Sequence, residues 1–118
     1  MELWINPACS KCRAATKAFD EAGIDYTVRR YLDDPPTAAE LSEVLTRLNL
    51  EPWDIVRHNE AAAKPLKTLP RDPAHRDDWI QAMVTDPILI QRPIITADDG
   101  TTAVARDPET LSKFIQPS

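Results

Sequence analysis

The chain has 118 residues, of which 42% are hydrophobic and 28% charged, and this composition is typical of one globular domain with an ordinary core. The net charge of -5 and the lack of a basic segment argue against direct nucleic-acid binding, and no apolar run is long enough to span a membrane. The start of the sequence does not resemble a signal peptide, so we expect a cytoplasmic, monomeric protein whose thiols stay reduced unless they do redox work.

The first part of the chain alternates strand and helix patterns. Residues 2–5 are apolar and precede an Asn-Pro pair, which predicts a buried strand that ends in a turn. Residues 11–22 have helical periodicity, and Gly23 predicts the end of the helix. The apolar positions of this helix are Ala15, Phe19 and Ala22. Residues 25–31 are rich in aromatic and β-branched types and predict a second strand.

The middle of the chain is predicted to be helical. Thr37 and Glu40 form a capping-box pattern at the start of a helix. The inner face of that helix is formed by Leu41, Val44, Leu45 and Leu48. Residues 51–74 are interrupted by prolines and predict loops with short helical turns. Another helix, which ends before Pro87, is indicated by Trp79, Ile80, Met83 and Val84.

The last part of the chain predicts a hairpin and a closing helix. Residues 92–106 have two strand patterns that meet at the Asp-Asp-Gly of positions 98–100. Asp107 is a candidate N-cap for a helix whose inner face is formed by Leu111, Phe114 and Ile115. The complete order is β-α-β, a helical insertion, then β-β-α around a small mixed sheet. This order predicts an α/β, thioredoxin-like fold as a single domain over residues 1–118.

Both cysteines of the chain lie in one C-x-x-C motif at the start of the first predicted helix. Cys9 directly precedes the helix, where unpaired backbone N–H groups and the helix dipole stabilise a thiolate. Cys12 lies in the first turn, close enough to form a disulfide with Cys9. The same N–H groups can hold an oxyanion, and Arg13 adds a cation with planar, bidentate donors. The motif therefore predicts a reactive Cys9 beside an anion site.

Two other interpretations of the cysteine pair are weaker. A zinc site would need His58 and His75 to converge on the motif, and their separation matches no compact ligand spacing. Two inert, buried cysteines are a simpler alternative, but the position at a helix start argues against it. We expect no metal and no organic cofactor.

Most arginines of a globular protein are solvated surface residues. Arg92 is different, because it lies between the apolar runs PILI and PII, and burial of a guanidinium without an anionic partner is costly.

Four stretches together resemble the glutaredoxin-linked arsenate reductase family: NPACSKCR, YLDDPPTAAEL, WDIVRHNE and DPILIQRPIIT. The resemblance extends from Leu3 to about Phe114 and agrees with the thioredoxin-like fold. It implies an enzyme of arsenic detoxification in which the thiolate of Cys9 attacks arsenate. It further implies that the oxyanion is held by Arg57, Arg92 and Arg106, and it matches Arg13 to a basic residue of the active-site loop. Thioredoxin-like folds commonly have a cis-proline opposite the active cysteine. The resemblance assigns this position to Pro93, so we expect the Arg92–Pro93 bond to be cis.

The chain departs from well-studied members of that family at two positions. Ile5 stands where those members carry a histidine, and Cys12 stands where they carry a hydroxyl residue. We expect Cys12 either to resolve the thiol–arsenate adduct as a Cys9–Cys12 disulfide or to remain idle while a small thiol does this work. The reducing partner is then a glutaredoxin, a thioredoxin, a mycoredoxin-type protein or a low-molecular-weight thiol.

Two other functions fit the cysteine motif. Spx-type redox regulators have the same fold and a C-x-x-C motif, but they act by binding RNA polymerase. A general thiol–disulfide oxidoreductase is a further alternative. Neither of them needs several cations around Cys9, so the arginines at positions 57, 92 and 106 favour the enzyme that acts on an oxyanion.

Overall fold

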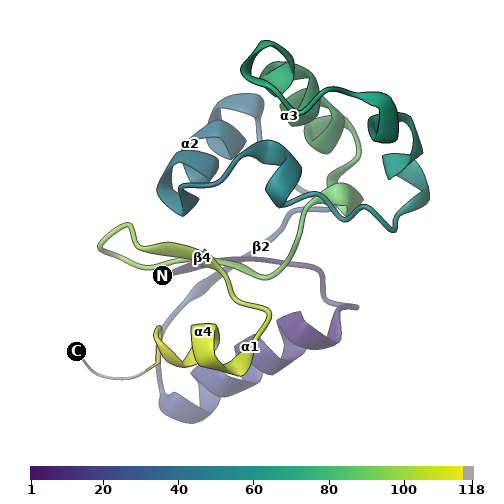
Figure 1. The fold of residues 1–118 in the computed structure, drawn as a ribbon. Helices are drawn as coiled ribbons and strands as arrows, with labels where there is room; N and C mark the ends of the chain where they lie inside the picture. The colour runs from purple at the N-terminus through teal and green to yellow at the C-terminus, as the bar shows by residue number, and fades with distance from the viewer. Residues whose placement is uncertain (116–118) are drawn as a thin grey trace. The chain divides into compact units, whose positions relative to one another are not determined.

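The computed structural model describes residues 1–115, and Figure 1 shows the order of their helices and strands. The chain divides into two compact units, one formed by Met1–Asp34 with the segment that begins at Arg92, and the other by Pro35–Gln91. No helix among the described residues is long and apolar enough to cross a membrane. The prediction of one domain over residues 1–118 stays a prediction.

The first unit is built on a small mixed sheet with the strand order β2-β1-β3-β4. Strands β1 (Glu2–Ile5) and β2 (Thr27–Arg30) are parallel, and helix α1 (Ser10–Ala22) connects them. Strands β3 (Ile94–Thr96) and β4 (Thr102–Val104) form the predicted hairpin, and β3 runs antiparallel to β1. This topology confirms the predicted β-α-β unit followed by a hairpin.

Helix α1 begins and ends close to where its sequence predicts. Gly23 adopts the left-handed conformation with φ 69°, and its N–H bonds to the carbonyls of Asp20 and Phe19. The buried side chains of the helix are Cys12, Ala15 and Phe19. Of the apolar positions at helical spacing, Ala15 and Phe19 are buried and Ala22 is exposed. The second cysteine of the motif also takes part in the core.

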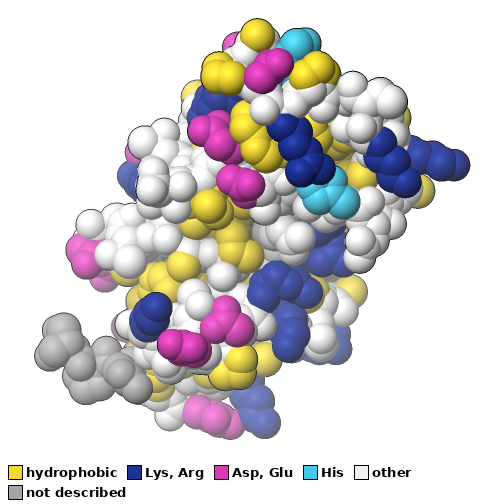
Figure 2. Space-filling view, viewed as in Figure 1, with side chains coloured by type: hydrophobic (Ala, Val, Ile, Leu, Met, Phe, Trp, Pro, Cys, Tyr) yellow, Lys and Arg dark blue, Asp and Glu magenta, His cyan; other side chains and the backbone are white. Residues whose placement is uncertain are grey.

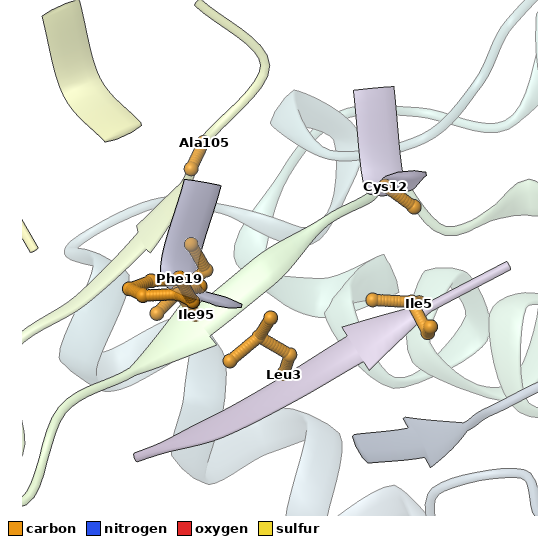
Figure 3. Close-up of a cluster of buried hydrophobic side chains, with 6 residues drawn as sticks. All are labelled: Leu3, Ile5, Cys12, Phe19, Ile95 and Ala105. Atoms are coloured by element: carbon orange, nitrogen blue, oxygen red, sulfur yellow. The ribbon is translucent and has the colours of Figure 1, made fainter. Parts of the chain in front are cut away.

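The core of the first unit lies between the sheet and the helices on one face of it. Leu3 and Ile5 of β1 point toward α1, because alternate residues of a strand share a face. Figure 3 shows the whole buried cluster, which consists of Leu3, Ile5, Cys12, Phe19, Ile95 and Ala105. Helix α4 (Pro108–Ser112) begins at the N-cap Asp107 and is shorter than predicted. Phe114 and Ile115 follow it in a turn and still pack against this cluster.

The second unit is mostly helical. Helix α2 (Ala38–Leu48) has the predicted capping box, and it packs against α3 (Arg76–Thr85). Four short 3-10 helices complete the unit: η1 (Pro52–Asp54), η2 (Ala61–Thr68), η3 (Pro73–His75) and η4 (Pro87–Leu89). Val56 and Ile90 form an isolated antiparallel bridge. The short helical turns predicted within residues 51–74 are η1 and η2, and η3 begins at the end of that stretch.

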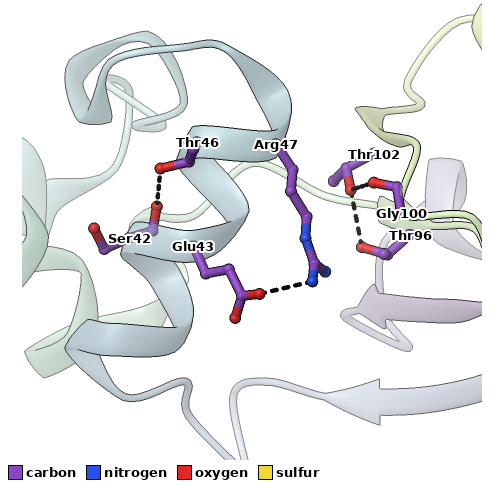
Figure 4. A network of polar contacts seen from close by, with 7 residues as sticks. All are labelled: Ser42, Glu43, Thr46, Arg47, Thr96, Gly100 and Thr102. Atoms are coloured by element: carbon purple, nitrogen blue, oxygen red, sulfur yellow. Dashed lines mark hydrogen bonds and ion pairs between the residues drawn. The ribbon is translucent and has the colours of Figure 1, made fainter.

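Polar side chains brace α2 and the hairpin, each within its own unit (Figure 4). On α2, Arg47 forms an ion pair with Glu43 at 2.7 Å, and the hydroxyl of Thr46 donates to the carbonyl of Ser42. In the hairpin, the hydroxyl of Thr102 donates to the carbonyl of Gly100 and to the hydroxyl of Thr96. These contacts stabilise local structure within each unit.

Candidate active site

The turn after β1 places Cys9 at the start of α1. The N–H of Cys9 donates to the carbonyl of Asn6 at 2.9 Å, and the side-chain oxygen of Asn6 accepts from the N–H of Ala8 at 3.0 Å. Cys9 is the N-cap residue, with the extended backbone that this position requires (φ -84°, ψ 125°). Its carbonyl accepts from the N–H of Arg13, which closes the first turn. The Asn-Pro pair therefore aims the Cys9 side chain at the free N–H groups of the helix.

The thiol of Cys9 is partly exposed and ionises readily. Burial acts to raise its pKa, but hydrogen bonds outweigh this effect and lower the pKa from 9.0 to about 7. The donors are the backbone N–H and the S–H of Cys12, the backbone N–H of Lys11 and the side chain of Arg106. At neutral pH about half of the Cys9 side chains are thiolates, against about one in a hundred at the ordinary value.

Cys12 differs from Cys9 in that it is buried and its pKa is raised. Its side chain is 0% exposed, and both cysteines are free thiols. Burial raises the pKa of Cys12 to about 12, and the neighbouring Cys9 charge adds to the rise. The N–H of Asn6, which lies 3.5 Å from Cys12 Sγ, and the charge of Arg92 act in the other direction. The pair therefore consists of an accessible thiolate and a buried, protonated thiol.

Arg92 and Pro93 lie directly before β3. The Arg92–Pro93 bond is cis, as predicted, and Arg92 is only 5% exposed, as its apolar neighbours indicate. The carbonyl of Pro93 accepts from the N–H of Ala105 at 2.9 Å, which ties this segment to the end of β4. Because the charge of Arg92 acts on Cys12, the guanidinium is part of the environment of the cysteine pair.

Arg106 connects the Arg92–Pro93 segment to Cys9 through hydrogen bonds of its side chain. Its Nη1 donates to the carbonyl of Arg92 at 2.6 Å, and its side chain also donates to Cys9. The first unit thus brings together five of the predicted site residues: Cys9, Cys12, Arg92, Pro93 and Arg106. A charge-assisted donor beside a thiolate is also suited to the oxygen of a bound anion.

Two predicted arginines are engaged elsewhere. Nη1 of Arg13 donates to the carbonyls of Pro7 and Ala8, at 3.3 and 3.2 Å, so this exposed side chain braces the loop before Cys9. Arg57 belongs to the second unit, where its Nε pairs with Glu60 at 3.2 Å and its N–H donates to the carbonyl of Leu89.

The histidines have local roles in the second unit. A ring nitrogen of His58 lies 3.1 Å from the carbonyl of Trp53, and His75 pairs with Asp72 at 2.6 Å. Residues 1–115 contain no cluster of three or more His, Cys, Asp or Glu side chains that could hold a metal ion.

The structure adds Asn6 to the site, which the pattern of cysteines and arginines did not identify, and it shows which N–H groups of the predicted helix start reach Cys9. Asn6 shapes the turn with its side chain and donates its N–H to Cys12. Lys11 donates its backbone N–H to Cys9. The Asn-Pro pair was a signal for the turn, but only the folded chain shows which donors reach each sulfur.

Known proteins resemble this chain over nearly its whole length. The sequence model of the ArsC family matches residues 4–114. A Neisseria meningitidis protein named arsenate reductase is 34% identical over 116 residues, which are 98% of this chain and 97% of that protein. An uncharacterized protein in the glnII region of Streptomyces viridochromogenes is 59% identical over 113 residues, 94% of this chain and 95% of that protein. The solved structure of an arsenate reductase from Vibrio cholerae matches with a TM-score of 0.85 at 30% identity, over 97% of this chain and 98% of that one. The structural match confirms the predicted fold.

Proposed function

The chain belongs to the ArsC family, and from this premise we propose that it reduces arsenate to arsenite with Cys9 as the attacking thiolate. The observation that supports this most directly is the lowered pKa of Cys9, which makes a partly exposed sulfur nucleophilic at neutral pH. Arg106 beside that sulfur supplies the charge that an oxyanion substrate needs.

In this proposal the arsenate is held by arginines and by the start of α1. Arg106 and Arg92 neutralise the anion from the sheet side, and the free N–H groups of α1 bind its oxygens. The family resemblance assigns Arg57 as the third arginine that holds the arsenate. Arg13 supports the loop carbonyls and so acts through the position of Cys9. The whole chain acts as one monomeric, thioredoxin-like ArsC domain.

The reaction has two thiol steps. First, Cys9 Sγ attacks arsenic, an S–As bond forms, and a hydroxyl group takes a proton and leaves as water. A second thiolate then attacks Cys9 Sγ and forms an S–S bond. The S–As bond breaks and its electron pair stays on arsenic, so As(V) becomes As(III) and leaves as arsenite. Two thiols are oxidised for each arsenate reduced.

Cys12 is the resolving thiol in this proposal. Its position in the first turn of α1 allows a Cys9–Cys12 disulfide, which a glutaredoxin, thioredoxin or mycoredoxin-type protein then reduces. Loss of the charge on Cys9 in the covalent adduct removes one of the influences that raise the pKa of Cys12. Its burial opposes ionisation throughout the reaction.

The test is a single turnover of the pre-reduced protein with arsenate, in which arsenite and free thiols are both counted. We expect one arsenite and the loss of two protein thiols without any added thiol. Arsenite that forms only after a small thiol or glutaredoxin is added would keep the reductase activity but contradict the Cys9–Cys12 disulfide. Cys9→Ser abolishes arsenite formation. Cys12→Ser forms arsenite only when a small thiol is added, and that thiol then remains on Cys9 as a mixed disulfide. Lys17→Ala, a surface change on the same helix, serves as the matched control.

Two other results would assign the cysteine pair to another function. If no arsenite forms with any reductant but oxidation alters binding to RNA polymerase, the protein is an Spx-type sensor. If no arsenite forms and the protein instead reduces many disulfides, it is a general thiol–disulfide oxidoreductase.

A further inference from the structure

A short segment of the second unit is basic, although the chain as a whole is acidic. Residues 61–71 contain Lys64, Lys67 and Arg71 but no Asp or Glu. The segment has a charge of +3 in a chain whose net charge is -5, so the other residues together have a charge of -8. Figure 2 shows Lys and Arg side chains gathered on the right of the second unit, where η2 lies. The three side chains of the segment form a basic strip.

The three cations of the basic strip are exposed, and no carboxylate within residues 1–115 forms an ion pair with them. The acidic residues that flank the segment have other partners. Glu60 pairs with Arg57 at 3.2 Å. Asp72 pairs with His75 at 2.6 Å. The positive charge of the strip is therefore available to a ligand from outside the chain.

The backbone of η2 holds the two lysines in a fixed arrangement. Ala63 and Leu66, which are 1% and 7% exposed, anchor this helix in the second unit. Pro65 inside the helix restricts the backbone further. Residues three apart in a 3-10 helix lie above one another with a rise of about 6 Å, so Lys64 and Lys67 share one exposed face.

Arg71 continues the strip and is held by Trp79. Its guanidinium carbon lies 5.9 Å from the centroid of the Trp79 ring. Nε1 of Trp79 donates to the carbonyl of Pro70 at 2.9 Å, and the ring is 0% exposed. A cation over a buried ring has a preferred position. The strip therefore requires little ordering when a ligand binds, which reduces the entropic cost of association.

We propose that the basic strip binds an acidic segment of a partner protein, whose carboxylates lie against Lys64, Lys67 and Arg71. This interaction goes beyond the proposed arsenate reduction and does not depend on it. Alternate side chains of an extended segment are about 6–7 Å apart, which matches the rise between the two lysines. Complementary charges of this kind favour the correct partner and speed association.

Two other polyanions fit the basic strip less well. Single-stranded nucleic acid stacks its bases on accessible aromatic rings, whereas the ring beneath Arg71 is buried. The charge of -8 on the other residues also repels a long polyanion. A membrane surface needs apolar side chains that insert beside the cations. The exposed large hydrophobic residues of the described chain are Val28 and Leu50, and both lie outside this segment.

The test uses a ten-residue peptide in which glutamate alternates with serine, and a second peptide with glutamine in place of glutamate. Binding to the full chain is followed by amide chemical shifts, and only the acidic peptide should shift residues 61–71. An exposed ion pair strengthens binding by a factor of up to about five, and reversal of a charge adds repulsion. We therefore expect Lys64→Glu/Lys67→Glu to weaken binding about tenfold or more. Lys64→Arg/Lys67→Arg should change it less than about twofold, because the charges remain.

A matched double variant in the first unit separates the strip from the net charge. Lys17→Glu/Lys113→Glu changes the net charge by the same amount on two exposed residues and should weaken binding less than about twofold. The difference between the two double variants should shrink at about 1 M salt, where charges are screened within about 3 Å. If the charge reversal in η2 prevents folding, Lys64→Gln/Lys67→Gln removes the two charges without repulsion and should weaken binding about fivefold.

Equal weakening by the two double variants, or no weakening by either, would overturn the inference. A ten-nucleotide single strand of DNA and vesicles that contain phosphatidylserine are titrated in parallel. If either binds more tightly than the peptide and Lys64→Glu/Lys67→Glu abolishes that binding, the strip belongs to nucleic acid or membrane and the inference is also overturned. All of these variants should still form arsenite in a single turnover, so failure of this inference is distinguishable from failure of the proposed function.

Discussion

Replacement of Cys12 by Ala should raise the pKa of the Cys9 thiol by about half a unit to one unit. The substitution removes the S–H donor of Cys12 but keeps its backbone N–H, which also bonds to Cys9. Hydrogen bonds to charged groups contribute about 1.5–3 kcal/mol. A thiol is a weak donor and Cys9 is partly exposed, so we expect between half of the lower value and nearly all of it. Because one pKa unit corresponds to about 1.4 kcal/mol, this is a rise of about half a unit to one unit.

The assay is the rate of alkylation of Cys9 by iodoacetamide as a function of pH, followed by mass spectrometry. A lowered pKa means that the thiolate population rises with pH and reaches half near pH 7 in the unchanged protein. Cys12 stays unlabelled in this range, because it is buried and its pKa is raised to about 12. The midpoint is the quantity to compare, since a thiolate of higher pKa also has a somewhat higher intrinsic reactivity.

The reasoning fails if the midpoint of Cys12→Ala coincides with that of the unchanged protein or lies below it. A midpoint near 9 in the unchanged protein would contradict the whole account of the Cys9 environment, since the four donors would then have no net effect. Arg106→Gln provides an independent check, because it removes the other side-chain donor and should also move the midpoint upward.

Three further predictions concern stability and are measured by urea unfolding. Thr37→Ala removes the capping box of α2 and should lower the free energy of unfolding by about 1 kcal/mol, whereas Thr46→Ala on the exposed side of the same helix should cost less than about 0.5 kcal/mol. Gly23→Ala should lower the free energy of unfolding by about 1–2 kcal/mol, because the φ of Gly23 is 69° and this left-handed conformation is unfavourable for alanine. An added Cβ would meet no atom within 4 Å, so the cost is conformational alone, and an unchanged stability would contradict this. Phe19→Ala leaves a cavity in the core of the first unit and should cost about 3 kcal/mol or more, and a loss below about 1 kcal/mol would show that Phe19 is not packed as described.

Local signals in the sequence predicted most of the elements. Gly23 ends α1, the Thr37–Glu40 pair begins α2, and the Asp-Asp-Gly of positions 98–100 joins β3 to β4. Each of these features depends on a few adjacent residues and on backbone geometry that they alone determine. The length of α4 could not be predicted in this way, because Phe114 and Ile115 pack against the core whether or not their backbone is helical.

The cysteine motif by itself determined that Cys9 lies at a helix start, because an apolar strand, an Asn-Pro turn and a periodic segment follow one another directly. Only the tertiary structure decided that the two thiols differ. Cys12 is protonated because β1 and β3 bury it, and Arg106, ninety-seven residues after Cys9, donates to the Cys9 sulfur because the hairpin returns the chain to α1. An ionisation state is set by burial and by nearby charges, and no short stretch of sequence states which distant residues will supply them.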